Sequence, residues 1–420
     1  MAESHQARQV RRDRNGMRAG VRWAHAVWLV GVVTVLAGVT GIVTAGAAQA
    51  SQAGKAASGA WKIEPTPNPA GAEISGLSAV SCTSGRACTA VGSDTASLSS
   101  PSFTLAERWN GKNWRIQPAA SPKGAASSNL FGVSCASVRA CTAVGTAFHT
   151  AGSLDVNLAE SWDGKSWRVR ATPDPKGATD GALYAVSCTS PSACTAVGDY
   201  DNAAGLVLAV AERWNGKAWR IQPIPRPAKR TWFFGVSCSA ARACTAVGYQ
   251  NNGTGDAQPF AEAWNGVQWH VQAVPLPHGV PGGALSAVSC TLSAACTATG
   301  TNFGGSRPTL AERWNGKGWR IQPTPNPVDY AQSAGEVALD GVSCTSATAC
   351  TASGEYSPGG VAAYFAEAWN GSKWRLETTP VPAGFSHGTL LGMSCALARC
   401  TAVGAWTGGV HPQATLAMAN

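Results

Sequence analysis

The 420-residue sequence lacks the patterns that would assign it to a common enzyme or helical class. It contains no G-x-S-x-G, H-E-x-x-H or P-loop motif, and no G-x-G-x-x-G in a β-α-β context. No long segment has apolar residues at a 3.6-residue period, which excludes helical solenoids. None of the 14 cysteines is left without a nearby partner, and no histidine recurs beside the pairs. The sequence therefore predicts no metal site and no cofactor.

What the sequence does contain is one pattern in seven copies. Each copy reads V-S-C, a short loop, C-T-A-V-G, a variable stretch, and then approximately A-E-R-W-N-G-K-x-W-R-I-Q-P-x-P. The first cysteines of successive copies are 50 to 54 residues apart. A period near this length is typical of the four-stranded blades of β-propellers.

Each copy predicts four short strands. Residues 130–135 represent the first strand and 141–145 the second, while 105–109 and 114–117 represent the third and fourth. Between the third and fourth strands, Asn110-Gly111 favours a tight hairpin, because both residues tolerate positive φ. The prolines that follow the fourth strand place it at a sheet edge, since proline cannot donate to a ladder.

The copies do not begin and end in register, and this offset predicts how the chain closes. Residues 61–67 repeat the fourth-strand pattern before the first copy, whereas the last copy ends at Asn420 without a fourth strand. A β-helix would need shorter repeats, and an open solenoid would not need its missing strand from the other terminus. We therefore expect an all-β, seven-bladed propeller at residues 61–420, in which the strand at Trp61 completes the last blade.

The cysteines are expected to form local disulfides across the loop between the first and second strands. Opposite positions in a short hairpin suit disulfide geometry, and each bridge would add about 2 kcal/mol. The alternative is reduced cysteines that serve as small, buried apolar residues. Disulfides require an oxidising compartment. The predicted pairs are Cys82/Cys88, Cys135/Cys141, Cys188/Cys194, Cys238/Cys244, Cys290/Cys296, Cys344/Cys350 and Cys395/Cys400.

The N-terminus predicts export. Residues 1–22 are rich in arginine, and residues 23–50 form an apolar signal that ends in Ala48-Gln49-Ala50, with cleavage before Ser51. Residues 51–60 are a linker. The apolar run at 23–47 is also long enough to span a bilayer, so a retained anchor with the propeller outside is the alternative. The protein is predicted to be secreted or membrane-anchored, and monomeric.

The formal net charge of +9 does not predict nucleic-acid binding. Part of the excess lies in the six arginines of the N-terminal head, and the rest of the chain has 26 basic against 21 acidic residues. This mild excess is spread over the whole repeat region. The arginines that recur in the third and fourth strands are interpreted as solvated.

The blocks S-C-T-S-x-x-A-C-T-A-V-G and A-E-R-W-N-G-K-x-W-R-I-Q-P-x-P resemble repeats in uncharacterised secreted proteins of high-GC actinobacteria. The resemblance covers residues 61–420 and implies a β-propeller-like fold, but no activity. The turn at 162–167 (W-D-G-K-S-W) also resembles the Asp-box turn of sialidase-type propellers, with a shorter spacing and, in most copies, Asn for Asp.

Residues that recur in every copy are interpreted as scaffold. One glutamate position, from Glu107 to Glu367, is filled in six copies, and Met418 holds it in the seventh. A single active site does not need six copies, so these glutamates are predicted to pair with arginine or tryptophan N–H between blades. The paired tryptophans are predicted to pack between blades.

The candidate binding face is where the loops vary. Loops between the first and second strands and the Asn-Gly turns are short and lie at one end of the ring, which we call the turn end. Loops between the second and third strands, and between copies, vary and lie at the other, the loop end. Six copies have an aromatic residue shortly after the second-strand glycine. The predicted ligand residues are Phe148, His149, Tyr200, Tyr249, Phe303, Tyr356 and Trp406.

These aromatic residues support two interpretations. They could form a rim that stacks sugars or grips a peptide, or they could cap the strand ends and pack between blades. The leading hypothesis is an extracytoplasmic module that binds a glycan or protein ligand. One alternative is a glycoside hydrolase or polysaccharide lyase, with Arg307, Tyr356, Glu355 and Asp199, or His149 and His387, as scattered candidates. The other is a structural envelope protein. Asp199 and Asp201 alone are too few to predict calcium.

Overall fold

The computed structural model describes residues 60–149, 154–225, 230–251, 257–303, 308–327, 333–358, 361–397, 399–408 and 411–420. All regular structure in these residues is β-strand. No helix that could cross a bilayer occurs among them. The predictions for residues 1–22, for the signal or anchor at 23–50 and for most of the linker fall outside the described residues.

The 28 strands form seven four-stranded antiparallel units. Unit 1 comprises β2 (Ile74–Ser84), β3 (Ala87–Thr95), β4 (Ser102–Trp109) and β5 (Trp114–Gln117). Units 2 to 4 comprise β6 (Ser127–Ser137), β7 (Ala140–His149), β8 (Leu154–Trp162) and β9 (Trp167–Arg170); β10 (Ala178–Ser190), β11 (Ala193–Asn202), β12 (Val207–Trp214) and β13 (Trp219–Gln222); and β14 (Arg230–Ala240), β15 (Ala243–Asn251), β16 (Ala257–Trp264) and β17 (Trp269–Gln272). Units 5 and 6 comprise β18 (Gly282–Leu292), β19 (Ala295–Phe303), β20 (Thr309–Trp314) and β21 (Trp319–Gln322); and β22 (Ser333–Ser346), β23 (Ala349–Pro358), β24 (Ala363–Trp369) and β25 (Trp374–Glu377). Unit 7 comprises β26 (Phe385–Ala396), β27 (Arg399–Gly408), β28 (His411–Ala419) and, out of sequence order, β1 (Lys62–Glu64).

The N-terminal strand completes the last unit, as the sequence predicts. β1 pairs antiparallel with β28, with Ile63 opposite Met418. This register is the same as that of unit 1, where Ile116 of β5 lies opposite Glu107 of β4. The strand that the last copy lacks is therefore supplied from the other end of the chain.

The expectation of seven blades needs a correction, because the units do not form seven separate sheets. A parallel bridge between Ile74 of β2 and Gln413 of β28 joins unit 7 to unit 1. Hydrogen bonding therefore gives six sheets, one of eight strands and five of four, and no sheet closes on itself. At this join, the N–H of Gln413 donates to the carbonyl oxygen of Glu73 at 3.3 Å.

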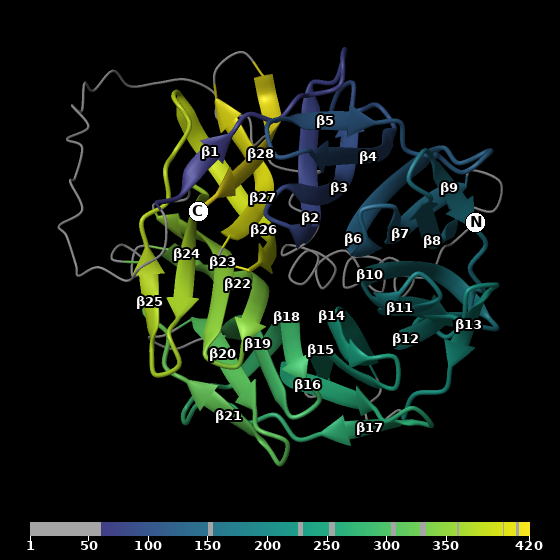
Figure 1. The fold of residues 1–420 in the computed structure, drawn as a ribbon. Coiled ribbons are helices and arrows are strands. Elements are labelled where there is room, and N and C mark those ends of the chain that lie inside the picture. Colours follow the sequence, from purple (N-terminus) through teal and green to yellow (C-terminus); the bar gives the residue numbers. More distant parts are fainter. Residues whose placement is uncertain are drawn as a thin grey trace, which may run out of the picture. The chain divides into compact units, whose positions relative to one another are not determined.

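The units are held in a ring by contacts between their innermost strands (Figure 1). Each of β2, β6, β10, β14, β18, β22 and β26 contacts the next, and β26 contacts β2. The N–H of Cys135 donates to Ser81 Oγ of the preceding unit at 2.9 Å, and the same bond recurs at every junction. The cycle closes where the N–H of Cys82 donates to Ser394 Oγ at 2.9 Å. The described residues thus form a β-propeller.

Tryptophans reinforce the junctions between units. The indole N–H of Trp319 donates to Gln272 of the preceding unit at 2.9 Å. The equivalent bond of the next unit joins Trp374 to Gln322 at 3.0 Å. The prediction that the paired tryptophans lie between blades is therefore confirmed at these junctions for the second tryptophan of each pair.

All seven predicted disulfides form, and each closes the hairpin between the first and second strands of one unit. The two cysteines lie opposite each other in the ladder, as Cys135 and Cys141 do, with Cα–Cα distances of 3.9 to 4.0 Å. The bridges indicate an oxidising, extracytoplasmic environment. They are Cys82–Cys88, Cys135–Cys141, Cys188–Cys194, Cys238–Cys244, Cys290–Cys296, Cys344–Cys350 and Cys395–Cys400.

The second cysteine of each pair is also a core residue, which corrects the expectation that bridging and buried apolar packing are alternatives. The first cysteine is half-buried, because its strand lines the inner wall of the ring. The second lies on a strand between two others and faces the preceding unit, as Cys141 Sγ does at 3.6 Å from Thr89 Oγ1. These second cysteines are 2% to 8% exposed: Cys88, Cys141, Cys194, Cys244, Cys296, Cys350 and Cys400.

The partners predicted for the recurring glutamates are wrong. Asn157 Nδ2 of unit 2 donates to Glu212 Oε1 at 2.8 Å, and the N–H of Ala120 donates to Glu160 Oε2 at 3.1 Å. Neither of these two glutamates accepts a hydrogen bond from an arginine or an indole N–H of the described residues. Arg108, the neighbour of Glu107, faces the next unit, over the Trp162 ring at 5.3 Å. Successive side chains of a strand point to opposite faces.

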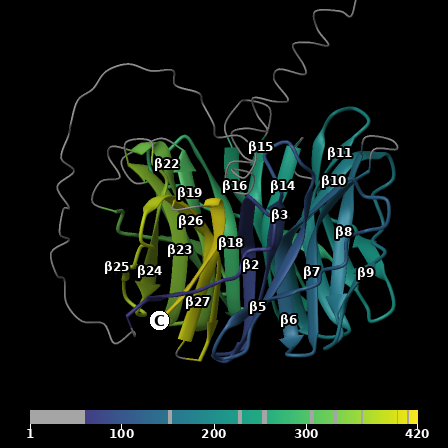
Figure 2. The same cartoon turned by 90° about the horizontal axis from the view of Figure 1, so that it is seen from above.

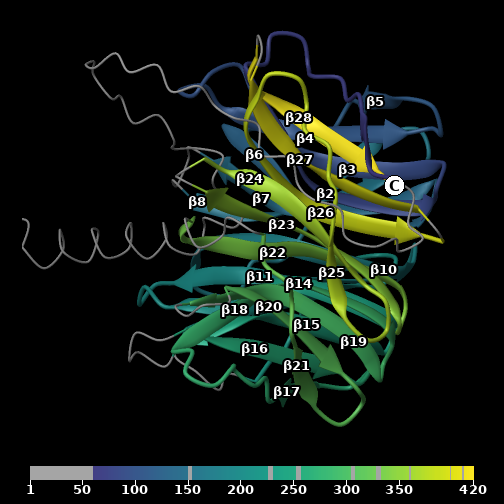
Figure 3. The ribbon, with the colours of Figure 1, turned by 90° about the vertical axis from the view of Figure 1, so that its left-hand side faces the viewer.

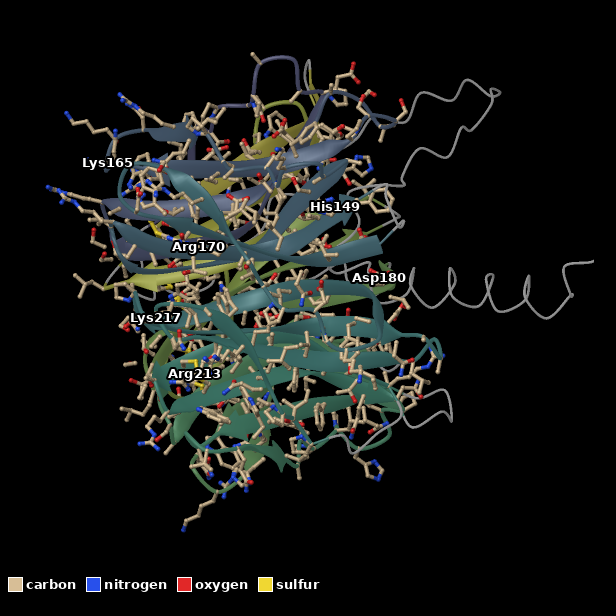
Figure 4. All side chains as sticks on the ribbon, turned by 90° about the vertical axis from the view of Figure 1, so that its right-hand side faces the viewer. His149, Lys165, Arg170, Asp180, Arg213 and Lys217 are labelled. Atoms are coloured by element: carbon tan, nitrogen blue, oxygen red, sulfur yellow. A yellow bond between two sulfur atoms is a disulfide. The ribbon has the colours of Figure 1, made fainter. Side chains whose placement is uncertain are left out.

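The two ends of the ring are distinct, as predicted from the loops. Figure 2 and Figure 3 show the units from the side, with strands running between the two ends. In Figure 4, Lys165, Arg170 and Lys217 lie at the turn end, and His149 and Asp180 lie at the loop end. The residues that follow the second-strand glycine therefore lie at the opposite end of the ring from the Asn-Gly turns.

Candidate functional site

Every innermost strand contains a β-bulge at the same position. In β6, for example, the pairing shifts between Leu130 and Gly132, which leaves Phe131 unpaired. A bulge leaves one residue outside the ladder and re-aims its side chain. The residues on either side scarcely change between copies, so the bulge is the variable position of a constant strand. The seven bulge residues are Ser78, Phe131, Tyr184, Phe234, Ser286, Asp340 and Leu391.

Tight packing around the bulge explains why only this residue varies. A Cβ at Gly132 would lie 2.8 Å from the carbonyl oxygen of Tyr184 in the next unit. On the partner strand, a Cβ at Gly145 would lie 1.9 Å from the carbonyl oxygen of Asn129. Adjacent innermost strands thus leave no room for larger residues, whereas the bulge side chain is only half-buried in units 2 to 4.

Three aromatic bulge residues meet across consecutive units. The ring centroids of Phe131 and Tyr184 are 5.6 Å apart, and those of Tyr184 and Phe234 are 5.7 Å apart. Equivalent positions of three units come this close only at the inner wall of the ring, because the units diverge outward. Phe131, Tyr184 and Phe234 therefore form a continuous half-buried aromatic surface, which we call the aromatic arc.

The arc continues toward the loop end through stacked rings and a carboxylate. Tyr249 stacks on Trp232 at 4.3 Å and lies 5.8 Å from Phe234. The Tyr184 hydroxyl donates to Asp199 Oδ1 at 3.4 Å. Burial, and then the charge of Asp199, raise the pKa of Tyr249. The carboxylate of Asp199 thus lies beside the aromatic arc and accepts a hydrogen bond from it.

Asp340 is the acidic member of the same bulge ring. Its side chain is 3% exposed, and neither carboxylate oxygen has a hydrogen-bond partner among the described residues. Burial, and then the charge of Glu355, raise the pKa of Asp340 well above its ordinary value. A buried carboxyl without a partner is costly. We define the inner-wall site as the aromatic arc together with Asp199 and Asp340.

The aromatic residues predicted from the sequence do not share one strand position. Tyr249 directly follows the second-strand glycine, Tyr200, Tyr356 and Trp406 are second after it, and Phe148 and Phe303 are third. Side chains alternate between the faces of a strand. The set is therefore split between opposite faces of the units, and the structure does not bring it together as one rim.

The surroundings of these residues also differ. Tyr200 and Tyr249 are 5% and 3% exposed, so their rings are packed, as the alternative interpretation expects. Tyr356 lies edge-on to Phe365, and Trp406 packs against the core of unit 7. Phe148, His149 and Phe303 are half-buried, and His149 Nδ1 lies 3.2 Å from the carbonyl oxygen of Gly124. A binding role for the set remains a prediction.

The scattered enzyme candidates are not assembled. Asp199 belongs to unit 3, Glu355 and Tyr356 to unit 6, and Arg307 lies outside the described residues. His387 Nδ1 lies 3.3 Å from Thr407 Oγ1 in unit 7. In the part of the chain that the structure describes, no group of three or more metal-ligating side chains occurs, including around Asp199 and Asp201.

The sequence carried a signal for the inner-wall site that the loop-based prediction missed. Aligning the copies on their cysteines shows one position, four residues before the first cysteine, that holds Ser, Phe, Tyr, Asp or Leu. Its neighbours stay small or apolar. Variability inside a constant strand marks a side chain freed from packing constraints.

The chain resembles known proteins only at the level of solved structures. No family model matches the chain, and no curated protein matches it. Among solved structures, YCF48 from Cyanidioschyzon merolae is similar with a TM-score of 0.49 at 14% identity, covering 86% of this chain and 98% of that one. The six-bladed fucose-recognising Aleuria aurantia lectin has a TM-score of 0.44 at 14% identity, covering 75% and 100%. A Trypanosoma rangeli sialidase has a TM-score of 0.41 at 8% identity, covering 83% of this chain and 54% of that chain.

The class of protein therefore rests on the structure itself. Antiparallel four-stranded units, linked through their innermost strands in a cycle, define a disulfide-bonded β-propeller. Its inner wall combines an aromatic arc with carboxylates.

Proposed function

We propose that the protein is an exported, seven-bladed propeller that binds a glycan at its inner wall. Counting each four-stranded unit as one blade gives seven, since the bridge from Ile74 to Gln413 joins two otherwise complete units. The disulfides support export into an oxidising compartment, either as a secreted protein or held at the membrane by residues 23–47. A rigid ring with a variable inner position suits ligand binding.

The aromatic arc carries this proposal. Half-buried aromatic rings in contact offer apolar faces on which the C–H faces of sugar rings can stack, while Asp199 can accept hydrogen bonds from hydroxyl groups. Asp340 adds two oxygens without a partner among the described residues. Aromatic faces combined with acceptors favour a glycan with many hydroxyls, or one that carries amino groups, over an anionic glycan.

The predicted loop-end residues extend the proposed site. Phe148, His149 and Phe303 are half-buried at the loop end and could contact a ligand that reaches beyond the inner wall. Tyr200 and Tyr249 support the site from within the packed interior. A protein ligand at the same surface is the alternative outcome of the experiment.

The experiment is a glycan-array screen of residues 51–420, produced with the disulfides formed. The fold itself supplies the substitutions, because serine already occupies the bulge in units 1 and 5 as Ser78 and Ser286. We expect Phe131→Ser combined with Tyr184→Ser to weaken binding to the glycan hit at least about tenfold, which corresponds to loss of about 1.4 kcal/mol. The matched control is Phe103→Ala, an exposed aromatic substitution on β4.

Two results would count against the proposal. One is a glycan hit that the double variant binds as tightly as the wild type while the melting temperature is unchanged. The other is an array without hits together with a protein ligand recovered on the same surface. Circular dichroism of each variant separates lost binding from lost folding.

A glycoside hydrolase is the second candidate, because Asp340 is a buried carboxyl whose two oxygens have no partner among the described residues, and the charge of Glu355 acts on it. Two carboxyls in unlike environments can divide the roles of acid and base. If the protein cleaves its glycan, Asp340→Asn should abolish product formation while binding persists. Binding without any product on prolonged incubation would leave the module a binder only.

A further inference from the structure

The turn end of the ring carries a concentration of exposed positive charge that the overall composition conceals. Five Asn-Gly or Asp-Gly turns carry a lysine: Lys112, Lys165, Lys217, Lys317 and Lys373. In the same units, the tryptophan that begins the fourth strand is followed by an arginine: Arg115, Arg168, Arg220, Arg320 and Arg375. The hairpins between the first and second strands add Arg86, Arg139, Arg242 and Arg399.

The few acidic residues at this end are already occupied. Asp163 forms an ion pair with Arg168 at 3.1 Å. Glu64 accepts a hydrogen bond from the indole N–H of Trp114 at 3.0 Å and also pairs with Arg399. Most other described acidic residues outside the unit interiors belong to the loop end, where Figure 4 shows Asp180. The turn end therefore has a large uncompensated positive charge.

Exposed apolar side chains accompany these charges at the tips of the turns. Val138, Leu292 and Leu397 lie in hairpins between the first and second strands, and Val267 replaces the turn lysine in unit 4. Val267 is 73% exposed, Leu292 is 65% exposed and Leu397 is 87% exposed. Leu397 also has a φ of 58°, a conformation in which glycine is usual. Lysine and arginine beside exposed apolar side chains are also the combination by which amphipathic helices bind the lipid headgroup region.

The chain also joins the ring at this end. Lys62 lies opposite Ala419, and Ala419 lies opposite Thr401, next to the hairpin of unit 7. The preceding 59 residues contain the arginine-rich head and the apolar run at 23–47. The described chain therefore enters the ring at the turn end, at Lys62.

We propose that the turn end docks on an anionic lipid bilayer. Each exposed lysine or arginine near such a surface contributes about 1 kcal/mol, and the turns present many of them at one end of a rigid ring. The apolar tips would enter the headgroup region. Docking in this orientation turns the loop end outward and leaves it open to ligands, although the proposal does not depend on any ligand.

The test is vesicle co-sedimentation of residues 51–420, which contain every described strand and disulfide and form one compact unit from Ala60. We expect binding to vesicles of phosphatidylcholine mixed with phosphatidylglycerol, weak binding to phosphatidylcholine alone, and release as salt is raised. Replacing Lys112, Lys165, Lys217 and Lys317 by glutamine should weaken binding at least about a hundredfold.

The matched control is Lys123→Gln with Lys176→Gln, which removes exposed lysines from the loop end and should leave binding unchanged. Val267→Lys gives the turn of unit 4 the lysine that five other units have, and it should increase the salt dependence of vesicle binding. Equal binding of the quadruple variant and the wild type would overturn the proposal. Binding to dextran sulfate but not to anionic vesicles would also overturn it, in favour of a soluble polyanion.

Discussion

The indole N–H of Trp61 donates to Glu377 Oε2 at 2.7 Å, although the two residues are 316 positions apart in sequence. Trp114 in turn donates to Glu64 at 3.0 Å. The same kind of bond links Trp319 to Gln272 between two internal units. The N-terminal strand therefore occupies the place of a fourth strand on both of its sides.

Trp61→Ala should destabilise the protein by about 3 kcal/mol, since it removes a buried ring at the closure. Trp61→Phe, which keeps most of the packing and loses only the N–H, should cost about 1 kcal/mol. Urea unfolding followed by tryptophan fluorescence measures both. An unchanged midpoint for Trp61→Ala would mean that the ring is stable without its closing strand.

The buried glutamates should make stability fall as pH rises. Burial raises the pKa of Glu262 to about 8 and that of Glu367 to about 9. The folded state therefore binds more protons than the unfolded state above pH 4.5 or so. The stabilisation is complete at acidic pH and is lost as pH rises through about 8. Thermal unfolding at a series of pH values should show this decline.

Glu262→Met tests the cause, because Met418 already holds this position in unit 7. The variant should gain on the order of 2 kcal/mol over the wild type at pH 9 and much less at pH 5. Glu73→Gln, an exposed substitution at the loop end, serves as the control. A pH-independent difference between Glu262→Met and the wild type would exclude titration of this carboxyl.

Supplying Glu262 with a hydroxyl should stabilise the fold. In unit 2, Asn157 lies opposite Thr146 and donates to Glu212 of unit 3. The equivalent residue of unit 3 is Ala209, which lies opposite Asp199 and faces Glu262 of unit 4. Both carboxyl oxygens of Glu262 lack a partner among the described residues. Ala209→Thr should add about 1 kcal/mol, whereas the nearly isosteric Ala209→Val should not. Equal melting temperatures for the two variants would rule out the hydrogen bond.

The disulfides predict a simple chemical result. No cysteine is free, since all 14 are paired in the described structure. Protein unfolded without reductant should therefore resist alkylation, and reduction should expose every thiol to the reagent, as measured by mass. Alkylation before reduction would show that some pairs do not form in the protein as produced.

Removing one disulfide should lower the free energy of unfolding by more than the contribution of the cross-link alone. The cross-link itself contributes about 2 kcal/mol, and Cys141 also belongs to the hydrophobic core of unit 2. The double variant Cys135→Ser/Cys141→Ala should therefore lower the urea midpoint less than Cys135→Ala/Cys141→Ser, because the second variant buries a hydroxyl. Urea unfolding of both variants measures the difference. Equal midpoints would mean that burial of the second cysteine does not affect stability.

Much of the scaffold could be predicted from the sequence, because its signals are local and repeated. Cysteine spacing placed Cys135 and Cys141 opposite each other, and Asn110-Gly111 marked a turn that the structure contains. The unpaired fourth-strand pattern at Trp61 predicted the closure. Each signal depends only on residues within one hairpin, or on comparing copies of one pattern.

Other features depended on which residues of different units meet. The six-sheet count arises from a bridge between Ile74 and Gln413, which no local pattern encodes. The partner of Glu212 is an asparagine of another unit rather than an arginine. The predicted aromatic residues also occupy different strand positions: Tyr249 directly follows the second-strand glycine and Tyr200 is second after it, so their side chains point to opposite faces.

The sequence by itself therefore determined the repeat, the strands, the disulfides and the strand that closes the ring. Only the tertiary structure decided that Phe131, Tyr184 and Phe234 meet at the inner wall, because their contact requires three units to converge on one axis. It also decided that cations scattered evenly along the chain gather at the turn end, since a fixed position in each repeat becomes one side of a ring.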